Sequence, residues 1–123
     1  MKLLRVHHVQ VTIPVGEEQK AREFYCTLLG LREIPKPSNL LKRGGLWIEL
    51  EGIQIHIGAY DLPKTAGSKE HVAFLVDSLD EWRVRLKSSQ IEVIDGTPVP
   101  GLIRFDIRDP FDNRIEFLQN TSV

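Results

Sequence analysis

A chain of 123 residues that is 41% hydrophobic and 27% charged can bury a core of its own and is too apolar to be disordered throughout. Its 16 Lys and Arg residues face 17 Asp and Glu residues, so no excess of positive charge is available for nucleic acid or an acidic membrane. A single cysteine excludes an intrachain disulfide. With neither a secretory signal nor an apolar run long enough to span a membrane, we expect a cytoplasmic protein.

The first half of the chain has the pattern of a strand, a helix and three more strands. Polar and apolar side chains alternate from His8 to Ile13, as in a half-buried strand. An amphipathic pattern predicts a helix over Glu17–Leu29. Alternation returns in three predicted strands, Leu31–Ile34, Leu46–Leu50 and Ile53–Ile57. Residues 34–45 are rich in Pro, Ser, Asn and Gly and indicate a surface loop that borders a pocket.

The second half repeats this pattern. His71–Val76 matches the first strand, with a histidine and an aliphatic residue before the alternation. A helix is predicted over Leu79–Ser89, capped by Asp77 or Ser78. Three more strands are predicted over Ile91–Ile94, Ile103–Ile107 and Arg114–Leu118. The fold class is therefore α+β, with one domain built from two βαβββ modules, residues 1–60 and 70–123, and a linker over 61–69. The modules are expected to form a curved mixed sheet with the helices outside and a concave inner face.

Alternation also predicts which side chains share that inner face. His8 and His71 occupy equivalent places in the two first strands, and His56 and Glu116 occupy matching places in the two last strands. Imidazole and carboxylate suit a divalent metal such as Zn, Ni, Mn, Co or Fe, and two histidines with one carboxylate leave coordination positions for a substrate. A lone strand histidine is usually a packing residue, but repetition at matched positions favours a metal site made of these four.

Other polar and aromatic residues carry weaker signals. Trp47 follows the predicted loop, and Arg104 could hold an anionic group, so both are candidate substrate-pocket residues. Packing is the usual role of a strand tryptophan, and solvated surface charge is the usual role of an arginine. Cys26 lies in the middle of a helix without a convincing basic neighbour on its face, which indicates packing rather than nucleophilic chemistry.

The sequence resembles the vicinal oxygen chelate superfamily of glyoxalases, bleomycin-resistance proteins and extradiol dioxygenases over nearly its whole length. The segments that carry the resemblance are His8-Val9, Ala21–Tyr25, Leu28–Leu31, Gly45–Trp47, Ile55–Ile57, His71–Phe74 and Asp109–Phe117. The resemblance implies paired βαβββ modules, a divalent metal on the first and fourth strands of the modules, and a homodimer. In thiol transferases and dioxygenases of this type the metal ligands are two histidines and a glutamate. The resemblance implies that His8, His71 and Glu116 are these ligands in the present chain.

Two positions depart from the family pattern. Asp112 stands where family members usually carry glycine, although Asp tolerates the left-handed conformation that the turn needs. His56 stands where typical glyoxalases carry a glutamate that can also act as the base, which argues against glyoxalase activity itself.

Two classes of function follow. The first is a metal-dependent enzyme for a small-molecule substrate, in which the cation activates a substrate oxygen, His56 is a fourth ligand or substrate contact, and Glu116 is a candidate base. Isomerase or lyase chemistry is favoured over Fe(II)-dependent oxygen insertion. The second is a non-catalytic protein that binds and sequesters a small molecule, as bleomycin-resistance proteins do.

Overall fold

The structure is a computed structural model that describes residues 1–61 and 67–121. The chain divides into two compact units, Met1–Lys64 and Thr65–Val123, and each unit is described by itself. Most of the predicted linker over residues 61–69 lies outside the described residues. The grouping of both modules into one domain with boundaries at residues 60 and 70 stays a prediction.

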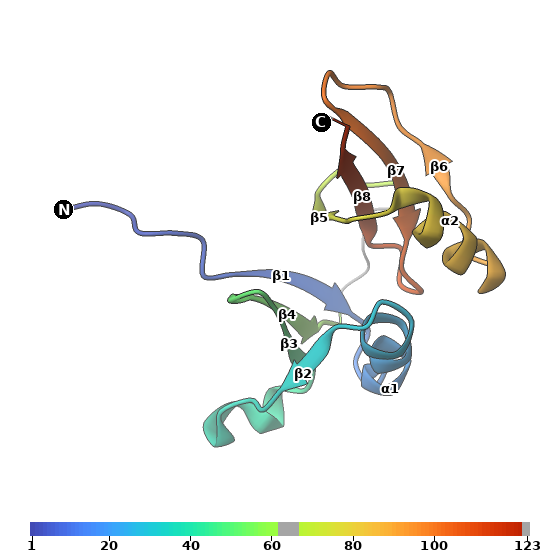
Figure 1. The fold of residues 1–123 in the computed structure, drawn as a ribbon. Helices are drawn as coiled ribbons and strands as arrows, with labels where there is room; N and C mark the ends of the chain where they lie inside the picture. The colour runs from blue at the N-terminus through green and yellow to red at the C-terminus, as the bar shows by residue number, and fades with distance from the viewer. Residues whose placement is uncertain (62–66, 122–123) are drawn as a thin grey trace. The chain divides into compact units, whose positions relative to one another are not determined.

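The first unit has the predicted order of elements (Figure 1). It consists of β1 (His8–Ile13), α1 (Glu18–Arg22), a π-helix (Glu23–Leu28), β2 (Arg32–Ile34), a 3-10 helix (Ser38–Arg43), β3 (Leu46–Leu50) and β4 (Ile53–Ala59). The 3-10 helix lies inside the segment that the sequence assigned to a surface loop. The second unit consists of β5 (His71–Leu75), α2 (Leu79–Ser88), β6 (Ile94–Asp95), β7 (Leu102–Arg108) and β8 (Arg114–Asn120).

The two units have the same sheet topology. Each has a four-stranded mixed sheet, in the orders β1-β4-β3-β2 and β5-β8-β7-β6. The first strand pairs in parallel with the last, and the other pairs are antiparallel. The register also repeats, because His8 pairs with Gln54 in the first unit as His71 pairs with Arg114 in the second. The α+β class with two βαβββ modules is therefore confirmed.

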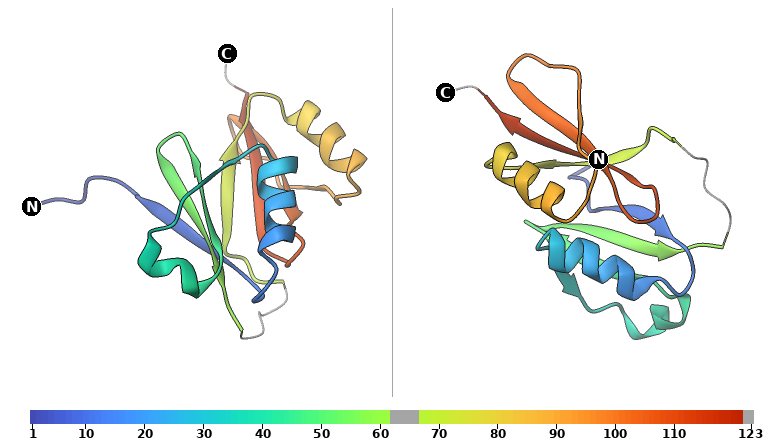
Figure 2. Two further views of the ribbon diagram at one scale, coloured as in Figure 1. Left: turned by 90° about the horizontal axis from the view of Figure 1, so that it is seen from below. Right: turned by 90° about the vertical axis from the view of Figure 1, so that its right-hand side faces the viewer.

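One face of each sheet packs against the helix of its own unit (Figure 2). On this face of the first unit the buried strand side chains are aliphatic, and Ala21, Phe24 and Tyr25 of the helical segment are buried with them. The buried aliphatic residues are Ile13, Leu46, Ile48, Ile55 and Ile57. In the second unit Phe117 of β8 stacks on Phe105 of β7 at 5.5 Å between ring centroids and meets Trp82 of α2 edge-on at 5.2 Å.

The ends of several elements are fixed by local chemistry. Ser78 caps α2, because its hydroxyl accepts a hydrogen bond from the Glu81 backbone N–H at 3.2 Å, as the sequence predicted. Asp112 has φ +70°, so aspartate does adopt the left-handed conformation in the turn before β8. Gly45 has φ +79°, and a Cβ there would lie 2.1 Å from the Ile57 carbonyl oxygen, so only glycine lets β3 begin this close to β4.

Four predicted elements differ from the structure by helix type or by two residues or more at one end. The helix over Glu17–Leu29 is α-helical only to Arg22 and then widens into a π-helix, in which the Leu29 N–H bonds to the Phe24 carbonyl five residues earlier. The strand expected over Ile91–Ile94 is the two-residue β6, because only Ile94 and Asp95 pair with β7. The last strands of both units run two residues further than predicted. No helix in the described part of the chain is long and apolar enough to cross a membrane.

Candidate functional site

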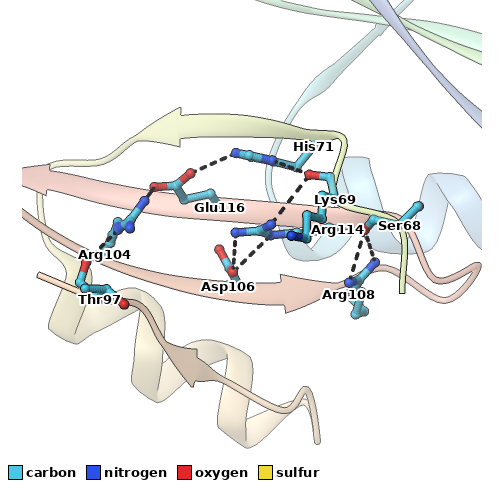
Figure 3. A network of polar contacts seen from close by, with 9 residues as sticks. All are labelled: Ser68, Lys69, His71, Thr97, Arg104, Asp106, Arg108, Arg114 and Glu116. Atoms are coloured by element: carbon cyan, nitrogen blue, oxygen red, sulfur yellow. Dashed lines mark hydrogen bonds and ion pairs between the residues drawn. The ribbon is translucent and has the colours of Figure 1, made fainter. Parts of the chain in front are cut away.

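The second unit brings His71 of β5 and Glu116 of β8 into direct contact. The His71 Nε2 atom lies 3.0 Å from Glu116 Oε2 (Figure 3). Their strands are hydrogen-bonded neighbours, and period-2 alternation puts both side chains on the sheet face opposite the phenylalanine core. Glu116 is buried, with 7% of its side chain exposed, whereas the His71 side chain is 31% exposed. A buried carboxylate needs partners to offset its desolvation.

The second nitrogen of His71 is fixed by the backbone. His71 Nδ1 lies 2.8 Å from the carbonyl oxygen of Lys69, just before the strand. Because a carbonyl oxygen only accepts hydrogen bonds, Nδ1 must carry a proton, so the lone pair of a neutral ring is on Nε2, beside Glu116. Histidine ligands of metals are usually oriented by such a bond from the other ring nitrogen. The 3.0 Å contact with Glu116 therefore needs either a proton or a cation between the two atoms.

Three arginines lie on this sheet face with Glu116. Arg104 Nη1 lies 3.2 Å from Glu116 Oε1, so both oxygens of that carboxylate have a partner. Next to this pair, Arg114 donates to Asp106 from Nε at 3.0 Å and lies within 2.8 Å of it through Nη2. Arg108 donates from Nη1 to the Asp112 carbonyl at 3.0 Å. Glu116 is the most buried acid of this face, and the Lys69 carbonyl, which lies 2.8 Å from His71 Nδ1 and 3.5 Å from Arg114 Nη1, links the two ion-paired groups (Figure 3).

The first unit presents aromatic rings at the equivalent positions. The His56 ring lies between two others: Trp47 stacks on it at 3.9 Å with an interplanar angle of 1°, and His8 stacks on it at 4.0 Å with an angle of 16°. Trp47 and His56 are register partners on the same sheet face. His7 meets His8 through a contact of 3.0 Å between their Nδ1 atoms, which leaves His8 Nε2 outside that contact.

The surroundings of His56 keep its ring neutral. Burial lowers the pKa of His56 below its ordinary value of 6.5, and the nearby His8, His7 and Lys36 lower it further. His56 Nε2 lies 2.8 Å from Gln54 Oε1, so Nε2 carries the proton and the lone pair of the neutral ring is on Nδ1. His56 is only 8% exposed. A neutral buried imidazole can accept a hydrogen bond or bind a cation.

The stacked rings limit what His8 and His56 can do together. A cation lies in the plane of the imidazole that binds it, along the nitrogen lone pair. Two rings stacked face to face point their lone pairs side by side rather than at one point, so one ring must turn before both can bind the same ion. Among residues 1–61 and 67–121, no three His, Cys, Asp or Glu side chains form a group that could hold a metal.

The structure thus brings the four predicted ligands together as two pairs, His8 with His56 and His71 with Glu116. Their convergence on one ion stays a prediction. Sequence reasoning missed two contacts to these pairs. Gln54 has the same strand parity as His56, so its bond to that ring was open to prediction. The Lys69 carbonyl belongs to the main chain, and no residue type signals its role.

Cys26 fits its predicted packing role. Its thiol is half-buried, and burial is the main reason that its pKa lies above the ordinary value. A raised pKa lowers the fraction of reactive thiolate at neutral pH.

The repeated βαβββ units with His, His and Glu at matched strand positions define a class of duplicated α+β proteins with paired imidazole and carboxylate donors. The sequence pattern of the Glyoxalase/Bleomycin resistance protein/Dioxygenase superfamily matches residues 5–117. The chain belongs to this superfamily.

Solved structures agree with this assignment. A glyoxalase family protein from Bacillus anthracis is 45% identical to the chain, with 98% of each chain covered and a TM-score of 0.91. A glyoxalase/dioxygenase from Nostoc punctiforme is 20% identical, with 96% of this chain and 92% of that chain covered and a TM-score of 0.79.

A more distant structural neighbour was solved with ligands. A variant of the fosfomycin resistance protein FosX from Listeria monocytogenes, complexed with Mn(II) and 1S,2S-dihydroxypropylphosphonic acid, is 20% identical, with 98% and 95% of the two chains covered and a TM-score of 0.81. At this identity the likeness concerns the fold. A search of curated proteins found no match.

Proposed function

We propose that the protein is a metal-dependent enzyme for a small molecule, with His8, His71 and Glu116 as the ligands of one divalent cation. The observation that carries this proposal is the His71–Glu116 pair, in which the ring nitrogen with the lone pair lies 3.0 Å from a buried carboxylate oxygen. Both donors are of the types that bind Zn, Ni, Mn, Co and Fe. The Mn(II) found with the FosX variant gives a precedent for a divalent cation in this fold.

His56 fits the role of a substrate contact better than that of a fourth ligand. Its ring is held between Trp47 and His8, and its Nε2 is bonded to Gln54, so turning it toward a cation would break both arrangements. Because the ring is neutral, its Nδ1 can accept a hydrogen bond from a substrate hydroxyl. The exposed part of Trp47 would form a wall for the apolar part of that substrate.

The chemistry assigned to the site is isomerase or lyase chemistry at a carbon next to a substrate oxygen. When bound, the cation would polarise that oxygen and stabilise the negative charge that develops on it. Glu116 is the candidate base, because its carboxylate can take a proton from the substrate. The Lys69 carbonyl keeps the His71 ring in place by its contact with Nδ1.

Metal content tests the proposal directly. Protein purified without a histidine tag should contain about one divalent metal per chain, and His71→Ala and Glu116→Gln should each lose it. Asp106→Asn is the matched control, since Asp106 is the register partner of Glu116 on the same sheet face but pairs with Arg114. The proposal is wrong if the wild-type protein contains no metal after growth and dialysis with each of Zn, Ni, Mn, Co and Fe.

A mixing experiment tells whether the ligands come from one chain or from two copies in the proposed homodimer. His8→Ala and His71→Ala should each lack metal on their own. If the two halves of a site belong to different copies, a mixed dimer of the two variants regains one intact site and binds metal. If both halves belong to one chain, the mixture stays metal-free. The mass of the protein in solution, measured by light scattering, tests the dimer itself.

The same measurements test two alternative functions. Two histidines and one carboxylate are also the ligand set of Fe(II) oxygenases, so specific uptake of iron and consumption of oxygen with a catechol would favour a dioxygenase. Sequestration of a small molecule is favoured by the absence of a three-donor group among the described residues. Binding of a ligand by protein that takes up no metal, with affinity lost in Trp47→Ala, would establish that function instead.

A further inference from the structure

Arg104 makes its contacts with Glu116 and with the main chain. Its Nη1 atom lies 3.2 Å from Glu116 Oε1, and its Nε donates to the Thr97 carbonyl at 3.0 Å (Figure 3). The side chain is 28% exposed, whereas that of Glu116 is 7% exposed. The guanidinium is therefore fixed at one end by the backbone and at the other by the buried carboxylate, where charge-assisted hydrogen bonds are strongest.

The loop before β7 is shaped to hold this arginine. The Gly96 N–H donates to the Arg104 carbonyl at 3.2 Å. A Cβ on Gly96 would lie 3.1 Å from Arg104 Cγ and 3.2 Å from Nε, which is tighter than most side-chain contacts. Glycine thus leaves the room in which the arginine stem lies, and the next residue, Thr97, supplies the acceptor that orients the guanidinium.

We infer that Arg104 is a positioning residue that leaves Glu116 a single oxygen for the cation. This inference rests on the proposed function. Arg104 occupies Oε1, so Oε2, which faces His71 Nε2, is the oxygen that remains. Partners of this kind orient a ligating carboxylate and tune the ion it holds. Arg104 then acts through Glu116, whereas the sequence suggested that it contacts the substrate.

Cobalt(II) gives a readout of this role that needs no activity. Its visible absorption weakens as the number of ligand atoms rises, so it reports whether Glu116 binds through one oxygen or two. We expect Arg104→Met to lower the absorption per bound Co(II), because Oε1 becomes available as an additional ligand atom. Gly96→Ala should also lower the absorption per bound Co(II), but by a smaller amount, because the substitution displaces the arginine without removing its charge. Arg104→Lys should keep part of the wild-type spectrum.

Arg108→Met is the matched control. Arg108 lies on the same strand and the same face, but its nitrogens contact the Ser68 and Asp112 carbonyls rather than Glu116. Its Co(II) spectrum should equal that of the wild type. Circular dichroism and the unfolding midpoint of each variant identify any that fails to fold, and Gly96→Ala tests the role with Arg104 still present.

The outcomes separate the inference from the function on which it rests. If the wild-type protein takes up no Co(II), both the positioning role of Arg104 and the proposed metal site are wrong. Wild-type protein that binds Co(II) while Arg104→Met and Gly96→Ala give unchanged spectra would overturn the positioning role and leave the metal site intact. Unchanged spectra together with a raised KM for an anionic substrate in Arg104→Met would return Arg104 to the substrate pocket.

Discussion

The two units have the same sheet topology, but the large aromatic side chains of their strands lie on opposite faces of the two sheets. In the first unit the strand core is aliphatic, with Leu46 paired to Ile57, and the rings of Trp47, His56 and His8 lie on the polar face. In the second unit Phe105 and Phe117 take the matching core positions, and the polar face carries ion pairs. The repeated register fixes where a side chain lies, while the residue type at each place is free to diverge.

In the proposed function this difference means that the two polar faces contact different parts of a ligand. The first unit offers stacked rings and amide groups suited to hold a planar or apolar part of a ligand. The second offers Glu116 with partners on both oxygens, suited to charge. The repeated fold gives two units with equivalent side-chain positions, and different residues at these positions give each unit its own chemistry.

The largest expected effect comes from truncating the aromatic core of the second unit. Phe117→Ala should lower the free energy of unfolding by about 3–5 kcal/mol, because Phe117 is 2% exposed and contacts Phe74, Trp82 and Phe105. The matching change in the first unit, Ile57→Ala, should cost about 2–5 kcal/mol.

Urea unfolding followed by fluorescence measures both changes, since each unit holds one of the two tryptophans, Trp47 and Trp82. Val84→Ala, at a position 67% exposed, is the control and should leave the midpoint unchanged. A loss from Phe117→Ala no larger than that of the control would contradict the aromatic core described for the second unit.

A smaller difference concerns the helix starts. Ser78 caps α2, whereas Glu17 at the start of α1 makes no capping bond through its side chain. Ser78→Ala should therefore lower the free energy of unfolding by about 1 kcal/mol. Ser89→Ala, beyond the other end of the same helix, is the control. Equal stability of the two variants in urea would mean that the cap contributes nothing.

The turns before the last strands offer a stabilising change. Glu51 and Gly52 both have positive φ, at 50° and 79°, as the two central residues of a type I′ turn require. Asparagine tolerates this conformation better than glutamate, so Glu51→Asn should raise the free energy of unfolding by about 0.5 kcal/mol. Glu92→Asn, outside any such turn, should give no gain in the same thermal or urea measurement.

The smallest expected effect is a pH dependence of the first unit. The pKa of His56 is lowered in the folded protein, so below pH 6.5 the unfolded chain takes up a proton that the folded one resists. Stability should therefore fall as the pH drops through this range and level off below the folded pKa. His56→Gln should flatten the curve in the presence of a chelator. A curve identical to that of the wild type would show that His56 titrates normally.

The sequence predicted the fold in most respects because alternation and repetition are local signals. The strand His8–Ile13 was predicted with its observed ends, whereas only the observed pairing with β4 places Trp47 on the face of His56. Two features depend on pairing and on contacts distant in sequence. The pattern of Ile91–Ile94 suggests a strand, but only pairing with β7 decides that the strand is Ile94–Asp95. The stacking that holds the His56 ring needs three strands in register, and no single segment signals it.

The π-helix from Glu23 to Leu28 has a consequence for comparing relatives of this chain. A wide turn absorbs one extra residue without shifting what comes before or after it, so Ala21 stays buried and Leu29 still closes the segment. Relatives in which this turn is an ordinary α-helix should lack one residue here, and an alignment without that gap would displace every later position by one. Deleting a single residue between Glu23 and Leu28 should accordingly be tolerated far better than a deletion in any strand, where it would turn alternate side chains to the wrong face.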